Sequence, residues 1–183
     1  MLIKEKQSGF TIVELLVVIV VIAILASIST VAFNGVQDSA RSAKMLAAID
    51  AYTKGVQIYK STNGNFPNPT PGSNVTLACL GPYPAKGVFG ANSCVNGNGT
   101  DAAFSNTTLN TQFSSVLGNL PDVSDISIKS GGTEIRGISY NLTGATDEGF
   151  FIYYVPGQNQ KCGRGVAQNV PSYNATECRV TFK

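Results

Sequence analysis

The most conspicuous pattern in the sequence is an unbroken apolar stretch near the N-terminus. Residues 10–33 read FTIVELLVVIVVIAILASISTVAF, and Glu14 is the single charged residue among these 24. At about 1.5 Å of rise per residue, a helix of this length spans about 36 Å, which exceeds a hydrocarbon core of about 30 Å. Lys4 and Lys6 precede the stretch and favour a cytoplasmic position for that end. The pattern predicts one transmembrane helix with the rest of the chain exported.

A second helical pattern follows directly. Residues 36–60 contain no proline, and their apolar positions recur at spacings of three and four, at Met45, Ile49, Tyr52, Val56 and Tyr59. This spacing places the five side chains on one face of an amphipathic helix. Gly64 and Pro67 then favour the end of the helix. We expect one long helix whose second part packs against a globular head.

The rest of the chain divides into a loop-rich part and a part with strand patterns. Residues 68–100 are rich in glycine, proline and asparagine, which predicts a long ordered loop. Residues 106–117 predict a short helix that ends at Gly118. Segments rich in β-branched and aromatic residues predict an antiparallel sheet of three or four strands, at 125–129, 134–142, 150–155 and 177–182. The expected fold class is α+β, with the long helix packed on this sheet.

Composition restricts the chemistry of the head. Charged residues make up 13% of the chain, against roughly 25% in typical soluble domains. The absence of histidine removes His-based acid–base catalysis, His-activated nucleophiles and His-containing metal sites. A net charge of +2 gives no electrostatic footprint for nucleic acid. The loop acids Asp122, Asp125, Asp147 and Glu148 match no EF-hand spacing. We therefore expect no enzyme, no cofactor and no metal site.

Four cysteines, at positions 79, 94, 162 and 178, all follow the apolar stretch. None forms a C-x-x-C pair, so an exported chain with this even count favours two disulfides over a zinc or redox site. Three pairings are open. We favour Cys79–Cys94 and Cys162–Cys178, because each closes a local loop of similar length. Closure of each loop should stabilise the fold by about 3 kcal/mol.

The N-terminus itself allows competing interpretations. Residues 23–27 imitate the small-residue site of a cleaved signal peptide, but neither a signal peptide nor a plain anchor has a use for a carboxylate at the front of the apolar run. Residues 9–16, Gly-Phe-Thr-Ile-Val-Glu-Leu-Leu, resemble the class III signal of the type IV prepilin family, which includes pilins, type II secretion pseudopilins and competence pilins. The resemblance is strong over residues 1–34, fair to about residue 67 and only architectural beyond.

The resemblance implies a processing site and an assembly residue. A prepilin peptidase would remove residues 1–9 by cutting between Gly9 and Phe10, and Phe10 would then be N-methylated. Glu14 would compensate the α-ammonium of a neighbouring subunit's Phe10 and so set the axial register of a filament. The implied organisation is a transmembrane and filament-core helix at 10–34, an amphipathic half at 35–61, and a head with a loop region at 62–124 and a sheet at 125–183. The Cys162–Cys178 loop resembles the C-terminal disulfide loop of many pilins.

Three functions follow as expectations. The first is a structural subunit of a type IV pilus for adhesion, twitching motility or DNA uptake, and the second is a pseudopilin of a type II secretion system. The third is a membrane-tethered exported enzyme or binding domain. The two disulfides, and the lack of acidic residues at 160–176 for a calcium loop, favour the first. The expected partners are copies of itself and related pilins, the prepilin peptidase and methylase, and an inner-membrane assembly platform, with no small-molecule substrate and no nucleic acid. The chain would sit in the cytoplasmic membrane with its head outside, and in an extracellular pilus after assembly.

Overall fold

The structure is a computed structural model of the 183-residue chain, and it describes residue 9 and residues 11–68, 75–85, 91–94, 103–130, 133–143, 148–170 and 174–183. The chain divides into two compact units, Met1–Ala40 and Arg41–Lys183. The first unit contains the beginning of helix α1. The second unit contains the rest of α1 and every other element.

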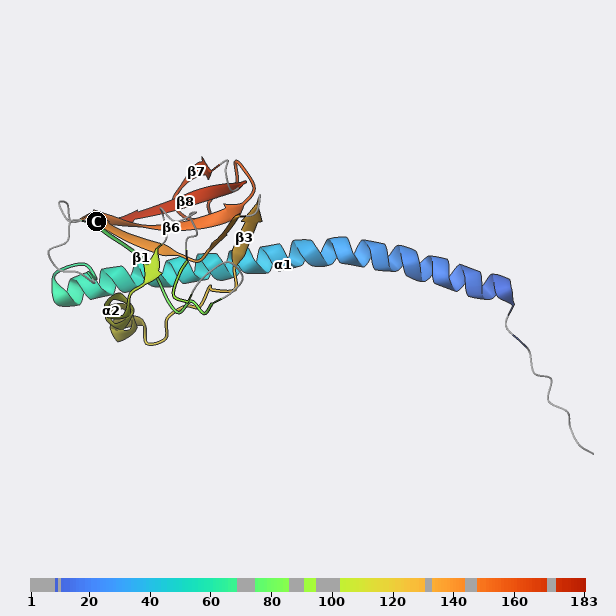
Figure 1. Ribbon diagram of the computed structural model, residues 1–183, viewed down its shortest axis with the longest axis horizontal. Coiled ribbons are helices and arrows are strands. Elements are labelled where there is room, and N and C mark those ends of the chain that lie inside the picture. The colour runs from blue at the N-terminus through green and yellow to red at the C-terminus, as the bar shows by residue number, and fades with distance from the viewer. Residues whose placement is uncertain are drawn as a thin grey trace, which may run out of the picture. The chain divides into compact units, whose positions relative to one another are not determined.

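Helix α1 runs from Ile12 to Asn63, over 52 residues (Figure 1). The single long helix predicted from the two adjoining patterns is confirmed. Gly64 directly follows the last helical residue, and its φ of +76° is a left-handed conformation that glycine adopts without steric cost. The Gly64 N–H donates a hydrogen bond of 2.8 Å to the Lys60 carbonyl, which satisfies one of the last acceptors of the helix.

In the first unit, the apolar part of α1 is exposed all round. The window Ile12–Ser29 is long and apolar enough to cross a membrane, with a mean hydropathy of 3.0, and none of it is buried. Its two serines do not interrupt the apolar surface, because their hydroxyls donate to helix carbonyls: Ser27 to Ile24 at 2.7 Å and Ser29 to Leu25 at 2.8 Å. No side of this helical stretch is buried in the part of the chain that the structure describes.

Among the residues that the structure describes, the second unit contains eight strands and a second helix. In chain order they are β1 (Val75–Cys79), β2 (Phe104–Ser105), α2 (Thr107–Leu117), β3 (Ser127–Ser130), β4 (Thr133–Arg136), β5 (Ser139–Thr143), β6 (Glu148–Pro156), β7 (Val166–Val170) and β8 (Ala175–Phe182). Six strands form one sheet in the order β2-β1-β5-β6-β8-β7, while β3 and β4 form a separate hairpin. All pairs are antiparallel except β1 with β2. The α+β class with an antiparallel-rich sheet is confirmed.

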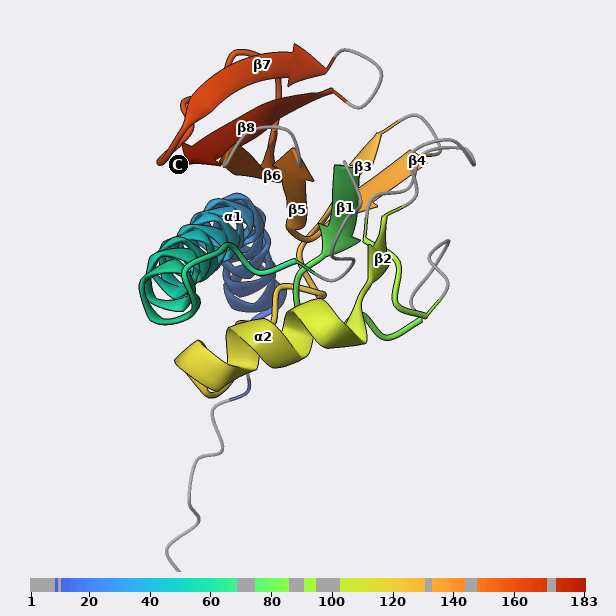
Figure 2. The same ribbon diagram turned by 90° about the vertical axis from the view of Figure 1, so that its left-hand side faces the viewer.

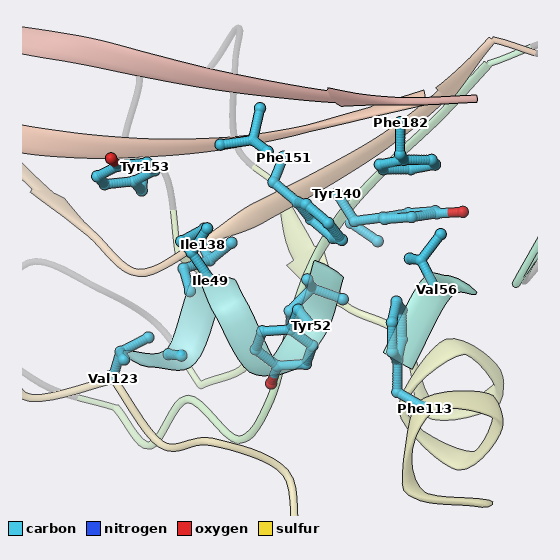
Figure 3. Close-up of a cluster of buried hydrophobic side chains, with 14 of the residues drawn as sticks. Ile49, Tyr52, Val56, Phe113, Val123, Ile138, Tyr140, Phe151, Tyr153 and Phe182 are labelled. Atoms are coloured by element: carbon cyan, nitrogen blue, oxygen red, sulfur yellow. The ribbon is translucent and has the colours of Figure 1, made fainter. Parts of the chain in front are cut away.

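The core of this unit lies where α1 meets the sheet. The part of α1 in this unit lies along the concave face of the six-stranded sheet, and α2 lies beside it (Figures 1 and 2). Ile49, Tyr52 and Val56 of α1 are fully buried, as the spacing of apolar residues predicted. Aromatic rings from α2 and the sheet complete the cluster (Figure 3): the Tyr52 and Phe113 rings meet edge to face with centroids 5.3 Å apart. The head therefore buries the apolar face of this amphipathic part of α1 in its own core.

One predicted strand is wrong in detail. Residues 134–142 form two strands, because β4 ends at Arg136 and pairs with β3, whereas β5 begins at Ser139 and pairs with β1 and β6. The break falls at Gly137, whose φ is +81°. The Tyr83 side chain fills the space that a Cβ at Gly137 would need, so the chain turns there to let the tyrosine reach the Ile138 N–H. A local strand pattern does not reveal such a tertiary contact.

Three strands of the large sheet were not predicted. β1 and β2 lie in or beside the segment taken as a long loop, and β1 pairs with β5, more than 50 residues further along the chain. β7 carries the sequence VAQNV, and four of its five side chains are exposed, so it lacks the alternation that marks a half-buried strand. The sheet consequently has more strands than the three or four expected.

Candidate assembly and processing site

A carboxylate closes the N-terminus of α1. Thr11 is the residue before the helix, and Glu14 lies in its first turn. The Glu14 Oε2 atom accepts hydrogen bonds from the Thr11 N–H and the Thr11 hydroxyl, both at 2.8 Å, while the Glu14 N–H donates to the Thr11 Oγ1 atom at 3.3 Å. This reciprocal arrangement is a capping box, and it places a negative charge at the end of the helix dipole that attracts one.

The capping box uses one of the two carboxylate oxygens of Glu14, the Oε2 atom. In the part of the chain that the structure describes, the Glu14 Oε1 atom accepts no hydrogen bond. The arrangement leaves an acceptor available for a second partner while Oε2 fixes the side chain in position. The role of Thr11 was missed in the sequence, although the spacing T-x-x-E in front of an apolar run is a recognisable signal for it.

The predicted processing residues lie at the same end of the helix. Gly9 is exposed, and no atom lies within 4 Å of the position that a Cβ would take. Phe10 lies outside the described residues, as do residues 1–8 of the predicted leader. The structure therefore brings Gly9 and Glu14 to one helix terminus, and the cleavage and methylation assigned to Phe10 stay predictions.

The apolar surface beyond this terminus is large. Exposed side chains follow one another around the helix rather than along one face, with exposed fractions from 47% to 84% at Ile12, Val13, Leu15, Leu16, Val17, Val18, Ile19, Val20, Val21, Ile22, Ile24, Leu25 and Ile28. Each such side chain gains about 1.5–3 kcal/mol when it is fully buried. The free energy available from burying this surface is therefore ample to hold the segment in a bilayer or in a bundle of helices.

Both disulfides lie in the head. Cys79 pairs with Cys94 and Cys162 with Cys178, the two local pairings favoured in the sequence. Their Cα–Cα distances of 5.7 and 5.6 Å lie in the ordinary range for disulfides. The first bridge ties β1 to the segment before β2, and the second ties the segment after β6 to β8. All four cysteines are used.

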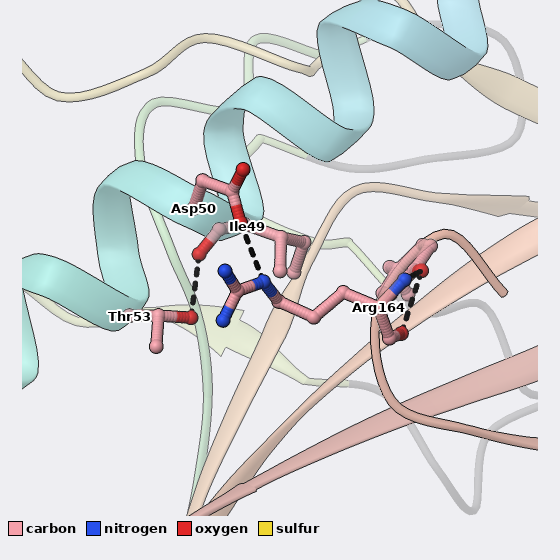
Figure 4. Close-up of polar contacts among 5 residues, drawn as sticks. Ile49, Asp50, Thr53 and Arg164 are labelled. Atoms are coloured by element: carbon pink, nitrogen blue, oxygen red, sulfur yellow. Dashed lines mark hydrogen bonds and ion pairs between the residues drawn. The ribbon is translucent and has the colours of Figure 1, made fainter.

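Polar contacts join the second disulfide loop to α1 within the head. The Arg164 Nε atom lies 2.5 Å from the Asp50 Oδ1 atom (Figure 4). The Tyr153 hydroxyl accepts from the Arg164 N–H at 3.2 Å and donates to the Arg164 carbonyl at 2.9 Å. Because both partners of the ion pair are about half exposed, it contributes at most about 1 kcal/mol. The contacts position the loop rather than supply much stability.

The described residues offer little for metal or acid–base chemistry. They include no group of three or more cysteine, aspartate or glutamate side chains placed to hold a metal ion. The strongest pKa shifts belong to buried tyrosines of the core: burial raises the pKa values of Tyr52, Tyr83 and Tyr140. These hydroxyls bond to backbone groups, as Tyr140 does to the Pro67 carbonyl at 2.7 Å. The site that remains is the helix N-terminus with its apolar extension.

Comparison with known proteins bears on that site. A family described as the prokaryotic N-terminal methylation motif matches residues 4–30. The chain carries the prokaryotic N-terminal methylation motif. The resemblance to the prepilin family, which includes the pseudopilins, is thereby confirmed. The motif includes Gly9, Thr11 and Glu14, together with most of the exposed apolar helix.

The curated relatives of this chain are core proteins of type II secretion systems. It is 38% identical over 64 residues to the type II secretion system core protein G of Aeromonas hydrophila, a match that covers 35% of this chain and 45% of the relative. It is 35% identical over 68 residues to the protein of the same name from Escherichia coli K12, covering 37% and 47% of the two chains. The chain thus spans about half the length of the curated relatives it matches. No solved structure matches it significantly.

Proposed function

We propose that this protein is a structural subunit of a type IV pilus, and that it polymerises through the N-terminal part of α1 into a surface filament. The observation that carries the proposal is the window Ile12–Ser29, an apolar helix exposed on all sides that begins with a capped carboxylate at Glu14. Lipid would cover this apolar surface before assembly, and the same helix of other copies would cover it afterwards. The filament would serve adhesion, twitching motility or DNA uptake.

Assembly requires processing at the front of this helix. A prepilin peptidase would cut after Gly9, and methylation would leave a cationic secondary ammonium at Phe10. Within a bundle of apolar helices, either this cation or the Glu14 carboxylate alone would cost several kcal/mol, whereas a hydrogen-bonded pair is tolerated. The Glu14 Oε1 atom would receive the ammonium of a neighbouring copy while Oε2 keeps its bonds to Thr11. This pairing would fix the axial register between subunits.

The proposal also sets the location and the partners. Before assembly the chain would cross the cytoplasmic membrane once, with the head outside, where its two disulfides can form. An inner-membrane assembly platform would extract the processed subunit into the fibre. The other subunits of that fibre would be copies of this chain and related pilins.

A second candidate is a pseudopilin of a type II secretion system. The relatives named core protein G favour it, although they match about a third of this chain. Two features favour the pilus subunit: the two disulfides, and the absence of acidic residues from positions 160–176. Deletion of the gene would separate the candidates. Loss of long surface filaments with protein secretion intact indicates a pilin, and loss of secretion from cells without such filaments indicates a pseudopilin.

The proposal is tested by mass spectrometry of the subunit from sheared surface filaments. We expect the mass of residues 10–183 with one hydrogen of the α-amine replaced by a methyl group, less the four hydrogens lost to two disulfides. The Gly9→Val variant should accumulate as uncleaved precursor in the membrane and should form no filaments. Subunits that retain Met1 in assembled filaments would contradict the proposed processing, and the absence of the protein from surface filaments would contradict the proposed pilus function.

A further inference from the structure

A polar cavity lies in the head, away from the features used above. It has a volume of about 340 Å³, within the range of about 300–1,000 Å³ that is common for small-molecule sites. Strand β2, helix α2 and the adjoining loops form it. The residues that matter here are Pro82, Asn92, Ser105, Thr107, Asn110 and Leu120. Two further hydroxyl side chains of α2 complete the lining.

The floor of the cavity is organised before any ligand arrives. The Asn110 Oδ1 atom accepts from the Gly81 N–H at 3.1 Å, and the Asn110 Nδ2 atom donates to the Ser105 hydroxyl oxygen at 2.9 Å. The Ser105 hydroxyl in turn donates to the Gly81 carbonyl at 2.9 Å. A ligand that binds here does not need to order these groups, which reduces the entropic cost of binding.

The rim presents polar groups that are not used by the fold. The side-chain amide of Asn92 and the hydroxyl of Thr107 have no hydrogen-bond partner among the residues that the structure describes. Asn92 is held by its backbone: its N–H donates to the Tyr83 carbonyl at 2.7 Å, and its carbonyl accepts from the Ser105 N–H at 2.6 Å. The Cys79–Cys94 disulfide bridges the chain two residues away. The backbone of Asn92 is therefore fixed, and its side-chain amide offers a donor and an acceptor at the rim.

The lining excludes most ligand classes by its chemistry. Among the described residues that line the cavity, none has an ionisable side chain or an aromatic ring, so these residues offer nothing to pair with a phosphate, a carboxylate or a cation, and no platform on which a nucleobase could stack. Strand β2 is paired on one side with β1 and on the other with Ser93, so no free strand edge is present there to which an extended peptide could add. Neutral hydroxyls and amides beside Pro82 and Leu120 remain, which suit the hydroxyl groups and the C–H faces of a sugar.

We infer that this cavity binds a neutral saccharide, with Asn92 and Thr107 as the residues that bond its hydroxyl groups. A shallow site with a few neutral hydrogen bonds should have a Kd on the order of 1 mM. Repetition of the site along a filament would raise the apparent affinity by a factor of about 10²–10⁴ through avidity. Binding by a single chain does not depend on assembly, so its failure would leave the proposed filament function intact.

The test is saturation-transfer NMR on the full chain in a detergent without a sugar headgroup. The probes are glucose, galactose, mannose and the corresponding N-acetylhexosamines, with glucose 6-phosphate as the charged comparison. The informative variant is Asn92→Gly, because Asn92 has a φ of +66° and glycine keeps that backbone conformation while removing the amide. Asn174→Gly is the matched control, since Asn174 also has a positive φ, of +45°, in a turn elsewhere in the head.

We expect saturation transfer to at least one neutral sugar, a reduction of at least threefold in Asn92→Gly, and no change in Asn174→Gly. Thr107→Val should weaken the signal as well, because it removes a hydroxyl at nearly constant volume. Absence of transfer to all of the neutral sugars would overturn the inference. Equal signals from Asn92→Gly and the parent chain, or stronger transfer to glucose 6-phosphate than to glucose, would overturn it too.

Discussion

The two parts of α1 contain similar apolar residues, but those of the first part are exposed and those of the second part are buried in the head. Over Ile12–Ser29 the apolar residues run without a period, and none of the window is buried within the chain. Further along, Met45, Ile49 and Tyr52 recur at helical spacing and are at most 4% exposed. A periodic stripe can be covered by one head, whereas a helix that is apolar all round needs a surrounding solvent or several partners. This contrast supports the proposal that lipid and other copies of the chain cover the first part.

The largest difference between the two parts should appear on truncating one matched isoleucine in each. Ile49→Ala removes a fully buried side chain and should cost about 2–5 kcal/mol of head stability. Ile19→Ala removes a side chain that is 56% exposed and should leave head stability unchanged. Urea unfolding of the detergent-solubilised chain, followed by tyrosine fluorescence, measures both. Equal midpoints for the two variants would mean that the burial difference has no energetic consequence.

The second prediction concerns the disulfides, which lie only in the second unit. Replacing Cys162 and Cys178 together by alanine should lower the free energy of unfolding of the head by about 3 kcal/mol, since the bridge closes a loop of 16 residues. The Cys79–Cys94 bridge closes a loop of similar length, so replacing both of these cysteines by alanine should lower the free energy of unfolding by about as much. Neither pair should change the fraction of chain that floats with the membrane. Impaired membrane insertion in either variant would show that the two units are not independent.

The third prediction is a pH dependence confined to the head. Burial raises the pKa values of Tyr52, Tyr83 and Tyr140 in the folded state above the unfolded value of about 10. Because the folded state then holds these protons more tightly, its stability is fully present below pH 10 and is lost as the pH rises further. Absorbance at 295 nm should show these tyrosines ionising together with unfolding. The apolar window Ile12–Ser29 contains no tyrosine, so its helical circular dichroism in detergent should persist.

The sequence predicted the parts of the fold that depend on local pattern. The first part of α1 follows from its unbroken apolar stretch, whereas the rest of α1, the short helix α2 and strands β6 and β8 follow from periodicity and from turn residues. The division of residues 134–142 at Gly137 was not foreseen, because it depends on Tyr83, which approaches from a distant segment. β7 was missed because its largely exposed side chains show no alternation of buried and exposed positions.

The candidate site divides in the same way. Gly9, Phe10 and Glu14 were predicted as site residues from the resemblance of residues 9–16 to a known signal, and their roles stay predictions. Thr11 was visible in the T-x-x-E spacing but became meaningful only through its contacts with Glu14. The polar cavity between β2 and α2 could not be predicted, since it joins the neutral side chains of Asn92 and Thr107, which belong to no sequence motif. Sites built from common polar residues are assembled by the fold and not by the local sequence.

The central claim is that Glu14 pairs with a cation on another copy of the chain, and two variants separate this role from capping. Thr11→Val removes the capping hydroxyl and keeps the carboxylate, so it should cost about 0.5–2 kcal/mol at the helix terminus and still allow filaments. Glu14→Gln keeps a hydrogen-bond acceptor for Thr11 but lacks the charge, so its filament yield should be intermediate at best. Glu14→Val removes both functions while leaving the Gly9-Phe10 junction unchanged.

The most direct measurement is the yield of surface filaments from cells whose only copy of the protein carries Glu14→Val, beside the pool of processed subunit in the membrane. We predict a normal processed pool, because the span becomes only more apolar. We predict no filaments, because each unpaired ammonium would cost several kcal/mol in the apolar bundle. Filaments at the parental yield from Glu14→Val alone would contradict the account, since the carboxylate would then serve only its own helix.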